Sequence, residues 1–241
     1  MSQYVYGKNV VRQLIREQKK IYEIVRSSGL HDKELERLIS QCGIPCKEVS
    51  RKEMDAMFRG VVHQGIAAHI EDYKTYSIEE ILACVPQGKT PLLVMLDGLE
   101  DPHNLGAILR TADAVGVDGI LLAKNRSVRL TPTVAKVSTG AIDTVKVGIV
   151  HNLSQTLRNL KKSGFWVAGA DMEHSVDYRQ ADYTSPLVLV IGSEGFGISS
   201  LVKKQCDFLV RLPMAGTITS LNASVACGIL LYQIYQQRHP L

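Results

Sequence analysis

The chain has 241 residues, of which 45% are hydrophobic and 22% are charged, and it carries a formal net charge of +4. This composition excludes a disordered or low-complexity protein and leaves enough apolar surface for one large domain or two modest ones. The small positive charge permits a polyanionic partner but does not require one.

From Tyr4 to Asp72, short helical and strand patterns alternate, as in "NVVRQLI", "IYEIV" and "GIAAHI". This alternation predicts a small α/β domain over residues 1–72. Its first twenty residues contain one acid, Glu17, and the following basic residues: Lys8, Arg12, Arg16, Lys19 and Lys20. Such a run is either a solvated helix face or an RNA contact. We expect His63, in "VHQG", to be structural or to face RNA rather than to bind a ligand.

The five cysteines are scattered, and the sequence shows neither the pattern of a secretory h-region nor a long apolar run. We therefore expect a soluble, cytoplasmic protein without a membrane partner. Cys42 and Cys46 have no second pair at zinc-finger spacing, so we expect small buried apolar residues here and no metal site.

Residues 73–90 are predicted to form a linker. They contain one short helical candidate, "SIEEILACV", which is followed by "PQGKT". Proline and glycine so close together typically end regular structure.

After Pro91 the strand candidates become continuous apolar runs, among them "LLVML", "GILLA", "TVKVGIV" and "LVLVI". Runs of this kind are typical of strands that are covered on both faces. Helical segments such as "LSQTLRNLKK" and "SVACGILLYQIYQQ" lie between or after them. We therefore predict an α/β fold over residues 91–241, with a mostly parallel sheet flanked by helices.

The stretch "DGLEDPHNLGAILRTADAVG" runs from Asp97 to Gly116, between a strand and a helix. One helical face carries the apolar residues and should pack on the sheet. This face consists of Leu105, Ile108, Leu109, Ala112 and Val115. Arg110 lies on the opposite side. We expect Asn104 to cap the helix and Gly106 to let helix and strand approach closely. The alternative to a functional role is a capped helix with a surface arginine.

In "VLVIGSEGFGIS", from Val188 to Ser199, a buried strand leads into three glycines and Glu194. Main chain without side chains can approach a ligand closely, although the stretch can also be a structural turn. Its spacing matches neither the dinucleotide fingerprint nor the P-loop.

The third stretch, "VRLPMAGTITSLNASVACGILLYQI", runs from Val210 to Ile234 and leads from a strand through a loop into an apolar helix. Ser220 is the predicted N-cap of that helix. Asn222 is a polar side chain in the first turn, so it needs a partner from the protein or from a ligand. Because the helix is apolar nearly all round, we expect it to be buried against both its own sheet and a partner.

In this order and at these separations, the three stretches resemble the motifs of the SpoU (TrmH-type) RNA 2′-O-ribose methyltransferases of the SPOUT superfamily. The segments "YVYGKNVVRQLI" and "HQGIAAHI" resemble the N-terminal RNA-binding domain that some members carry. The resemblance implies a C-terminal deep trefoil knot, S-adenosylmethionine as cofactor, no metal, and a homodimer whose active sites are completed near the interface.

The resemblance also implies which residues form the site. The cofactor-binding residues are Gly192, Leu212, Met214 and Leu221. The catalytic residues are Asn104, Arg110, Glu194, Ser220 and Asn222. Asn104 would orient the ribose or Arg110, Glu194 would pair with a cation or the substrate, and Ser220 and Asn222 would hydrogen-bond phosphate or ribose. Because a guanidinium hardly ever loses its proton, Arg110 is better suited to hold phosphate or a developing alkoxide than to act as a base.

The subgroup that the chain most resembles methylates a guanosine of bacterial 23S ribosomal RNA. We therefore expect RNA as the partner and this transfer as the reaction. Two alternatives remain: a methyltransferase acting on transfer RNA or on another ribosomal site, and a non-catalytic RNA-binding or ribosome-assembly factor. The intact motif residues favour an enzyme.

Overall fold

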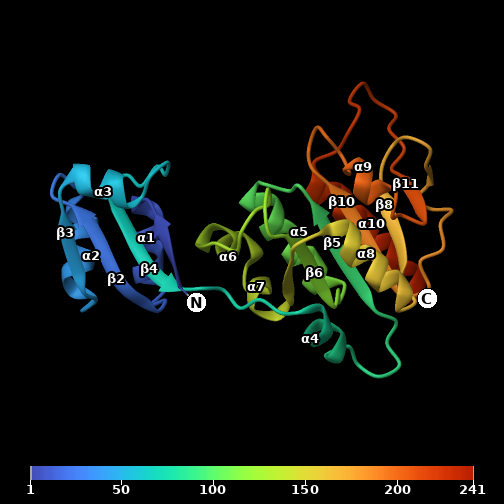
Figure 1. Ribbon diagram of the computed structural model, residues 1–241, viewed down its shortest axis with the longest axis horizontal. Coiled ribbons are helices and arrows are strands. Elements are labelled where there is room, and N and C mark those ends of the chain that lie inside the picture. The colour runs from blue at the N-terminus through green and yellow to red at the C-terminus, as the bar shows by residue number, and fades with distance from the viewer. Residues whose placement is uncertain (1, 241) are drawn as a thin grey trace. The chain divides into compact units, whose positions relative to one another are not determined.

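The computed structural model describes residues 2–240 and divides the chain into two compact units, one ending at Tyr73 and the other beginning at Lys74 (Figure 1). Each unit has its own hydrophobic core. Among the described residues, no helix is both long and apolar enough to cross a membrane.

The first unit is α/β, as predicted. Its elements are β1 (Ser2–Tyr6), α1 (Lys8–Arg16), β2 (Ile21–Ser27), α2 (Lys33–Gln41), β3 (Cys46–Val49), α3 (Arg51–Met57) and β4 (Ile66–Glu71). The sheet has the order β1-β4-β2-β3, in which β4 is antiparallel to both neighbours and β2 is parallel to β3. Apolar side chains of α1, α2, β2 and β4 form the core. Cys46 is exposed and Cys42 only partly buried, so the expectation that both are buried was wrong.

The basic run at the start of the chain is largely paired within the protein. Arg12 forms an ion pair with Asp32 at 2.8 Å, and Arg16 pairs with Glu34. Both acids belong to the N-terminal end of α2, where their negative charge also interacts favourably with the helix dipole. These two arginines therefore hold α1 against α2, which is a structural role.

His63 is structural as well. The side chain is 3% exposed, and its Nδ1 accepts a hydrogen bond from the main-chain N–H of Gly65. Because Nδ1 accepts, the proton of a neutral ring lies on Nε2, which is 2.8 Å from Asp55 Oδ1. The ring therefore fixes the turn before β4.

The segment predicted as a linker contains helix α4 (Ile78–Ala83), which Ser77 and Glu80 cap reciprocally. Tyr76 N–H donates to Val147 O at 2.9 Å, and Ile81 is fully buried in the core of the second unit. From Tyr76 on, this segment is attached to the second unit.

The second unit contains a seven-stranded sheet in which every pair of neighbours is parallel, as predicted. Its strands are β5 (Leu92–Asp97), β6 (Gly119–Ala123), β7 (Val147–Val150), β8 (Trp166–Ala170), β9 (Val176–Asp177), β10 (Leu187–Gly192) and β11 (Phe208–Arg211). Its other helices are α5 (Pro102–Ala114), α6 (Pro132–Ser138), α7 (Ala141–Thr144), α8 (Leu153–Lys162), α9 (Ser200–Lys203) and α10 (Ala223–Arg238). The trefoil knot stays a prediction.

The order of the strands indicates at which edge of the sheet a ligand is expected to bind. The sheet runs β7-β6-β5-β10-β8-β11-β9, so from β5 the chain forms β6 and β7 on one side, crosses to form β8 on the other side, and later places β10 between β8 and β5. Helices α4, α8 and α9 share one core with the sheet, whereas α5 and α10 contact each other and α10 contacts β10 (Figure 1). In parallel sheets, ligands bind outside the carboxyl ends of the strands where the order reverses. Here that point lies between β5 and β10.

Gly106 lies where two helices meet, and the expectation that it serves a helix and a strand was wrong. A Cβ atom on Gly106 would lie 2.5 Å from Val137 Cβ of α6 and 3.2 Å from the main-chain nitrogen of Ser138. The absent side chain lets α5 and α6 pack closely.

We expect Gly106→Ala to lower the free energy of unfolding by about 1–3 kcal/mol, because the added methyl group overpacks the contact between α5 and α6. Chemical denaturation measures the change. Adding Val137→Ala removes the atoms that clash and should restore part of the loss. A Gly106→Ala protein as stable as the wild type would contradict this account of the contact.

Candidate functional site

Helix α5 begins three residues earlier than an Asn104 cap requires. Asp101 is the N-cap and accepts a hydrogen bond from His103 N–H at 2.9 Å, and Pro102 occupies the first helical position. Proline is favoured there because its fixed φ suits a helix and its missing N–H would be unpaired anyway. The prediction that Asn104 caps the helix was wrong, and its side chain, in a residue 5% exposed, is free for other contacts.

The cap of helix α10 also differs from the prediction, here by lying later in the chain. Asn222, and not Ser220, is the N-cap, because Asn222 Oδ1 accepts hydrogen bonds from Ser224 N–H at 2.9 Å and Val225 N–H at 3.3 Å. Ser220 lies in the preceding loop. The N–H groups of the helix thus partner Asn222 Oδ1, and Asn222 Nδ2 remains available to donate to another group.

Three residues of the three sequence stretches meet in one hydrogen-bonded cluster. Asn104 Nδ2 donates to Glu194 Oε1 at 2.9 Å, and Asn222 Nδ2 donates to the same oxygen at 2.6 Å. Asn222 Nδ2 also lies 2.9 Å from Asn104 Oδ1, which accepts from it. The cluster ties the N-terminal ends of α5 and α10 to the loop after β10, and the positive ends of the helix dipoles favour a carboxylate there.

The loop after β10 requires glycine at the last position of the strand, Gly192. A Cβ on Gly192 would lie 2.1 Å from the carbonyl carbon of Gly197, so no other residue fits without moving the main chain. Ser193 and Gly197 exchange two main-chain hydrogen bonds, which fold the loop back on itself and place Glu194 in the turn. Gly195 and Gly197 have φ values of 88° and 66°, which glycine adopts without strain.

Two acidic residues that the sequence reading missed also shape this edge. Asp97, the last residue of β5, accepts a hydrogen bond from Ser199 N–H at 2.7 Å and so fixes the far end of the same loop. Asp171, directly after β8, pairs with Lys203 of α9 at 2.6 Å. The available signal for both was an acidic residue at the carboxyl end of a buried strand.

A cavity of about 980 Å³ opens between these loops at the carboxyl edge of the sheet. Its lining includes the following predicted residues: Gly192, Glu194, Leu212, Met214, Ser220, Leu221 and Asn222. The volume lies at the upper end of the range of small-molecule sites. Seven residues predicted to bind the cofactor or to act in catalysis thus line one cavity.

Arg110 does not line this cavity. It is exposed on α5, and neither a hydrogen bond nor an ion pair involves its side chain in the part of the chain that the structure describes. Asn104 is also absent from the lining, but it contacts Glu194 and Asn222, which belong to it. Within one chain, therefore, Arg110 stands apart from the other predicted residues.

The chain matches two known families along most of its length. Residues 91–232 match the SpoU rRNA Methylase family, and residues 4–76 match a domain described as RNA 2'-O ribose methyltransferase substrate binding. A Bacillus subtilis (strain 168) protein that is assigned to the TrmH family of tRNA/rRNA methyltransferases is 45% identical over 242 residues. That alignment covers 99% of this chain and 97% of the relative.

Solved structures agree with this assignment. An rRNA methyltransferase from Sinorhizobium meliloti with bound AdoMet has a TM-score of 0.62 and 26% identity, covering 100% of this chain and 88% of that chain. A TrmH/SpoU tRNA modifying enzyme from A. aeolicus has a TM-score of 0.57 and 35% identity, covering 62% of this chain and 76% of that chain.

The residues that line the cavity fit S-adenosylmethionine. Gly192 leaves room for main chain to approach a ligand, and apolar side chains such as Leu212 and Leu221 suit an adenosyl group. Three carboxylates line the cavity: Asp171, which pairs with Lys203, and Glu173 and Glu194. Their negative charge attracts a sulfonium group. In residues 2–240, no three His, Cys, Asp or Glu side chains gather in a group that could hold a metal ion. The chain belongs to the SpoU rRNA Methylase family and is an S-adenosylmethionine-dependent RNA methyltransferase.

Proposed function

We propose that the protein transfers a methyl group to a ribose 2′-hydroxyl of RNA, and that its target is a guanosine of 23S ribosomal RNA. The observation that carries the proposal is the cluster of Asn104, Glu194 and Asn222 at the rim of the cavity. The match of residues 4–76 to a ribose methyltransferase substrate-binding domain supports the 2′-hydroxyl as acceptor. We place the reaction in the cytoplasm, because ribosomal RNA is found there.

When bound, S-adenosylmethionine supplies an electrophilic methyl group. The chain itself has to hold the ribose hydroxyl in line with that group and to help it lose its proton, so positioning and local electrostatics supply most of the rate. We assign positioning to the cluster, because its hydrogen bonds fix α5, α10 and the loop after β10 relative to one another. Ser220, in the loop before α10, is placed to hydrogen-bond phosphate or ribose.

Arg110 reaches the reaction, in this proposal, from a second copy of the chain. Helix α10 buries one side and exposes a second apolar stripe, which consists of Val225, Ile229, Tyr232 and Tyr235. Helix α10 contacts α5, which carries Arg110. A twofold contact through this stripe would cover the exposed apolar surface and would bring Arg110 of each copy towards the cavity of the other.

We expect Tyr232→Glu to convert a dimer into a monomer and to abolish methyl transfer, because a charge in the middle of the stripe opposes its burial. Light scattering after gel filtration gives the mass, and binding of S-adenosylmethionine should persist. Leu201→Glu is the control, because Leu201 is an exposed apolar side chain on α9. A wild-type protein that is monomeric at micromolar concentration would refute the dimer.

Transfer RNA is the second candidate substrate, because the B. subtilis relative is assigned to tRNA/rRNA methyltransferases and the A. aeolicus structure is a tRNA modifying enzyme. Mapping of 2′-O-methyl groups in ribosomal and transfer RNA from cells with and without the gene decides between them. We expect one guanosine of 23S RNA to lose its methyl group. If no RNA is methylated by the wild-type protein, the chain is an RNA-binding or assembly factor instead.

A further inference from the structure

The loop between β6 and α6 carries a cavity that has no assigned role. We call residues Lys124–Arg129, "KNRSVR", the basic loop. Its main chain is fixed at two points: Lys124 N–H donates to Val150 O at 2.8 Å, and Val128 N–H donates to Leu99 O at 2.7 Å. The second bond joins the basic loop to the turn that leads into α5. The loop is thus held at the same edge of the sheet as the cofactor cavity.

The basic loop exposes positive charge that the protein does not compensate. Lys124, Arg126 and Arg129 are exposed, and they line a cavity of about 370 Å³ in which Glu100 is the acidic residue. None of the ion pairs among residues 2–240 involves these four side chains. Unpaired cations at a fixed place attract a polyanion.

Two features of the basic loop indicate that it binds a ligand and does not only support the fold. Arg126 has φ at 53°, a region that glycine enters freely and that strains other residues. Ser127 Oγ is buried and has no hydrogen-bond partner in the structure. Buried hydroxyls are normally paired, and an oxygen of a bound phosphate would accept a hydrogen bond from Ser127 Oγ.

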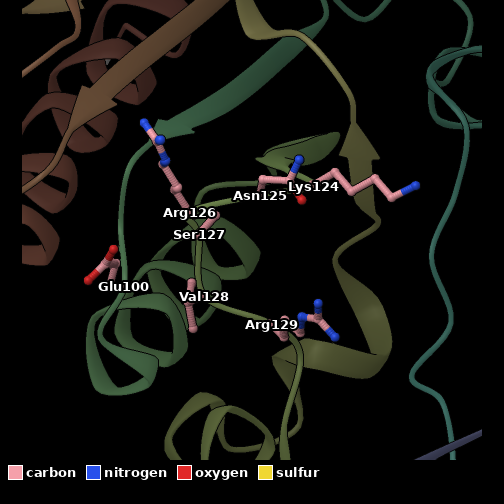
Figure 2. Close-up of a pocket in the computed structure, with 7 residues that line it drawn as sticks. All are labelled: Glu100, Lys124, Asn125, Arg126, Ser127, Val128 and Arg129. Atoms are coloured by element: carbon pink, nitrogen blue, oxygen red, sulfur yellow. The ribbon is translucent and has the colours of Figure 1, made fainter.

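The directions in which the basic side chains point favour an RNA strand as the ligand over a single small anion. Figure 2 shows that Arg126 and Lys124 leave the loop in different directions, while Arg129 lies further along it. One small anion cannot contact all three, whereas phosphates spaced along an RNA strand can. Strand β6 lies two positions from β10 in the sheet, or about 10 Å at the usual spacing of strands. That distance spans one or two nucleotides.

We propose that the basic loop binds successive phosphates of the RNA strand that flanks the methylated nucleotide. The identification of the ligand as this RNA strand rests on the function proposed above. The contacts are to the backbone, so they fix the position of the RNA and do not read its sequence. Arg126 and Arg129 each hold one phosphate, and Ser127 donates a hydrogen bond to a phosphate oxygen.

The test compares the full-length wild type with Arg126→Gly, which removes the cation and keeps the backbone conformation accessible. Binding to an unmodified 23S ribosomal RNA transcript is measured across a series of KCl concentrations. We expect a loss of about tenfold in affinity. The slope of log K against log salt should fall by about 0.7. Arg126→Gly combined with Arg129→Gln should lower the slope about twice as much.

Lys162→Ala is the matched control, because it removes an exposed cation from the last turn of α8. A slope for Arg126→Gly equal to that of this control would overturn the proposal. Tight binding of inorganic phosphate, lost in Arg126→Gly with RNA binding unchanged, would assign the site to free phosphate and overturn it as well. Calorimetry with S-adenosylmethionine and a methyl transfer assay are run on the same proteins. A wild type that transfers no methyl group to RNA refutes the proposed function separately, since the salt slope does not depend on turnover.

Discussion

Arg110→Ala is expected to lower the rate of methyl transfer about 100-fold to 1000-fold, while the affinity for S-adenosylmethionine stays unchanged. The loss follows from removing a guanidinium that would clamp a substrate phosphate and stabilise the developing alkoxide. The fold should be unaffected, because the Arg110 side chain is exposed and makes no hydrogen bond or ion pair within residues 2–240. Single-turnover kinetics measure the rate, and calorimetry measures cofactor affinity.

Arg110→Lys is the informative control for this variant. Lysine keeps the charge but loses the planar fork of donors, so we expect only partial recovery of the rate. An Arg110→Ala rate within threefold of the wild type, a limit of about 0.7 kcal/mol, would contradict the role assigned to the side chain.

Mixed dimers test whether Arg110 acts across the interface. A subunit with Arg110→Ala keeps its own cofactor cavity, and a subunit with Gly192→Ala keeps its arginine. If each site takes Arg110 from the other copy, a reassorted 1:1 mixture of these two inactive proteins should regain about a quarter of wild-type activity. An equally inactive mixture, with heterodimers demonstrated by mass spectrometry, would show that Arg110 does not serve the partner's site.

We expect Gly192→Ala to nearly abolish methyl transfer, because the substitution disturbs the cofactor cavity. The added Cβ would lie 2.1 Å from Gly197 C and 2.4 Å from Ile198 N, so the returning main chain has to move. Its displacement shifts Glu194 away from Asn104 and Asn222. We expect at least about a tenfold loss of S-adenosylmethionine affinity. We also expect a fall of about 100-fold in methyl transfer.

Gly195→Ala serves as the control in the same loop. Nothing lies within 4 Å of a Cβ at Gly195, although its φ of 88° costs an alanine about 1–2 kcal/mol of strain. Cofactor affinity measured by calorimetry should therefore change less than in Gly192→Ala. Equal losses in the two variants would mean that backbone strain, and not the close approach at Gly192, governs the loop.

Much of the fold followed from local patterns. Continuous apolar runs predicted a parallel sheet, because such strands are covered on both faces, and the structure shows seven parallel strands. The apolar face of α5 was also correct, since helical periodicity alone separates Leu105, Ile108 and Leu109 from the exposed Arg110.

The sequence did not predict those details of the fold that depend on which residues and helices become neighbours. Asp101 and Asn222 cap the helices in place of Asn104 and Ser220, because proline at the first helical position and competing polar side chains decide each helix start. The partner of Gly106 is a helix that the sequence reading had not identified.

By itself, the sequence determined the α/β class, the family motifs and the residue types of the site. Only the tertiary structure decided that Asn104, Glu194 and Asn222 share hydrogen bonds across separations of 90 and 118 residues along the chain. Periodicity reports which face of an element is buried, but not which elements become neighbours. That choice was made when β10 paired with β5, which brought their loops together at one edge of the sheet.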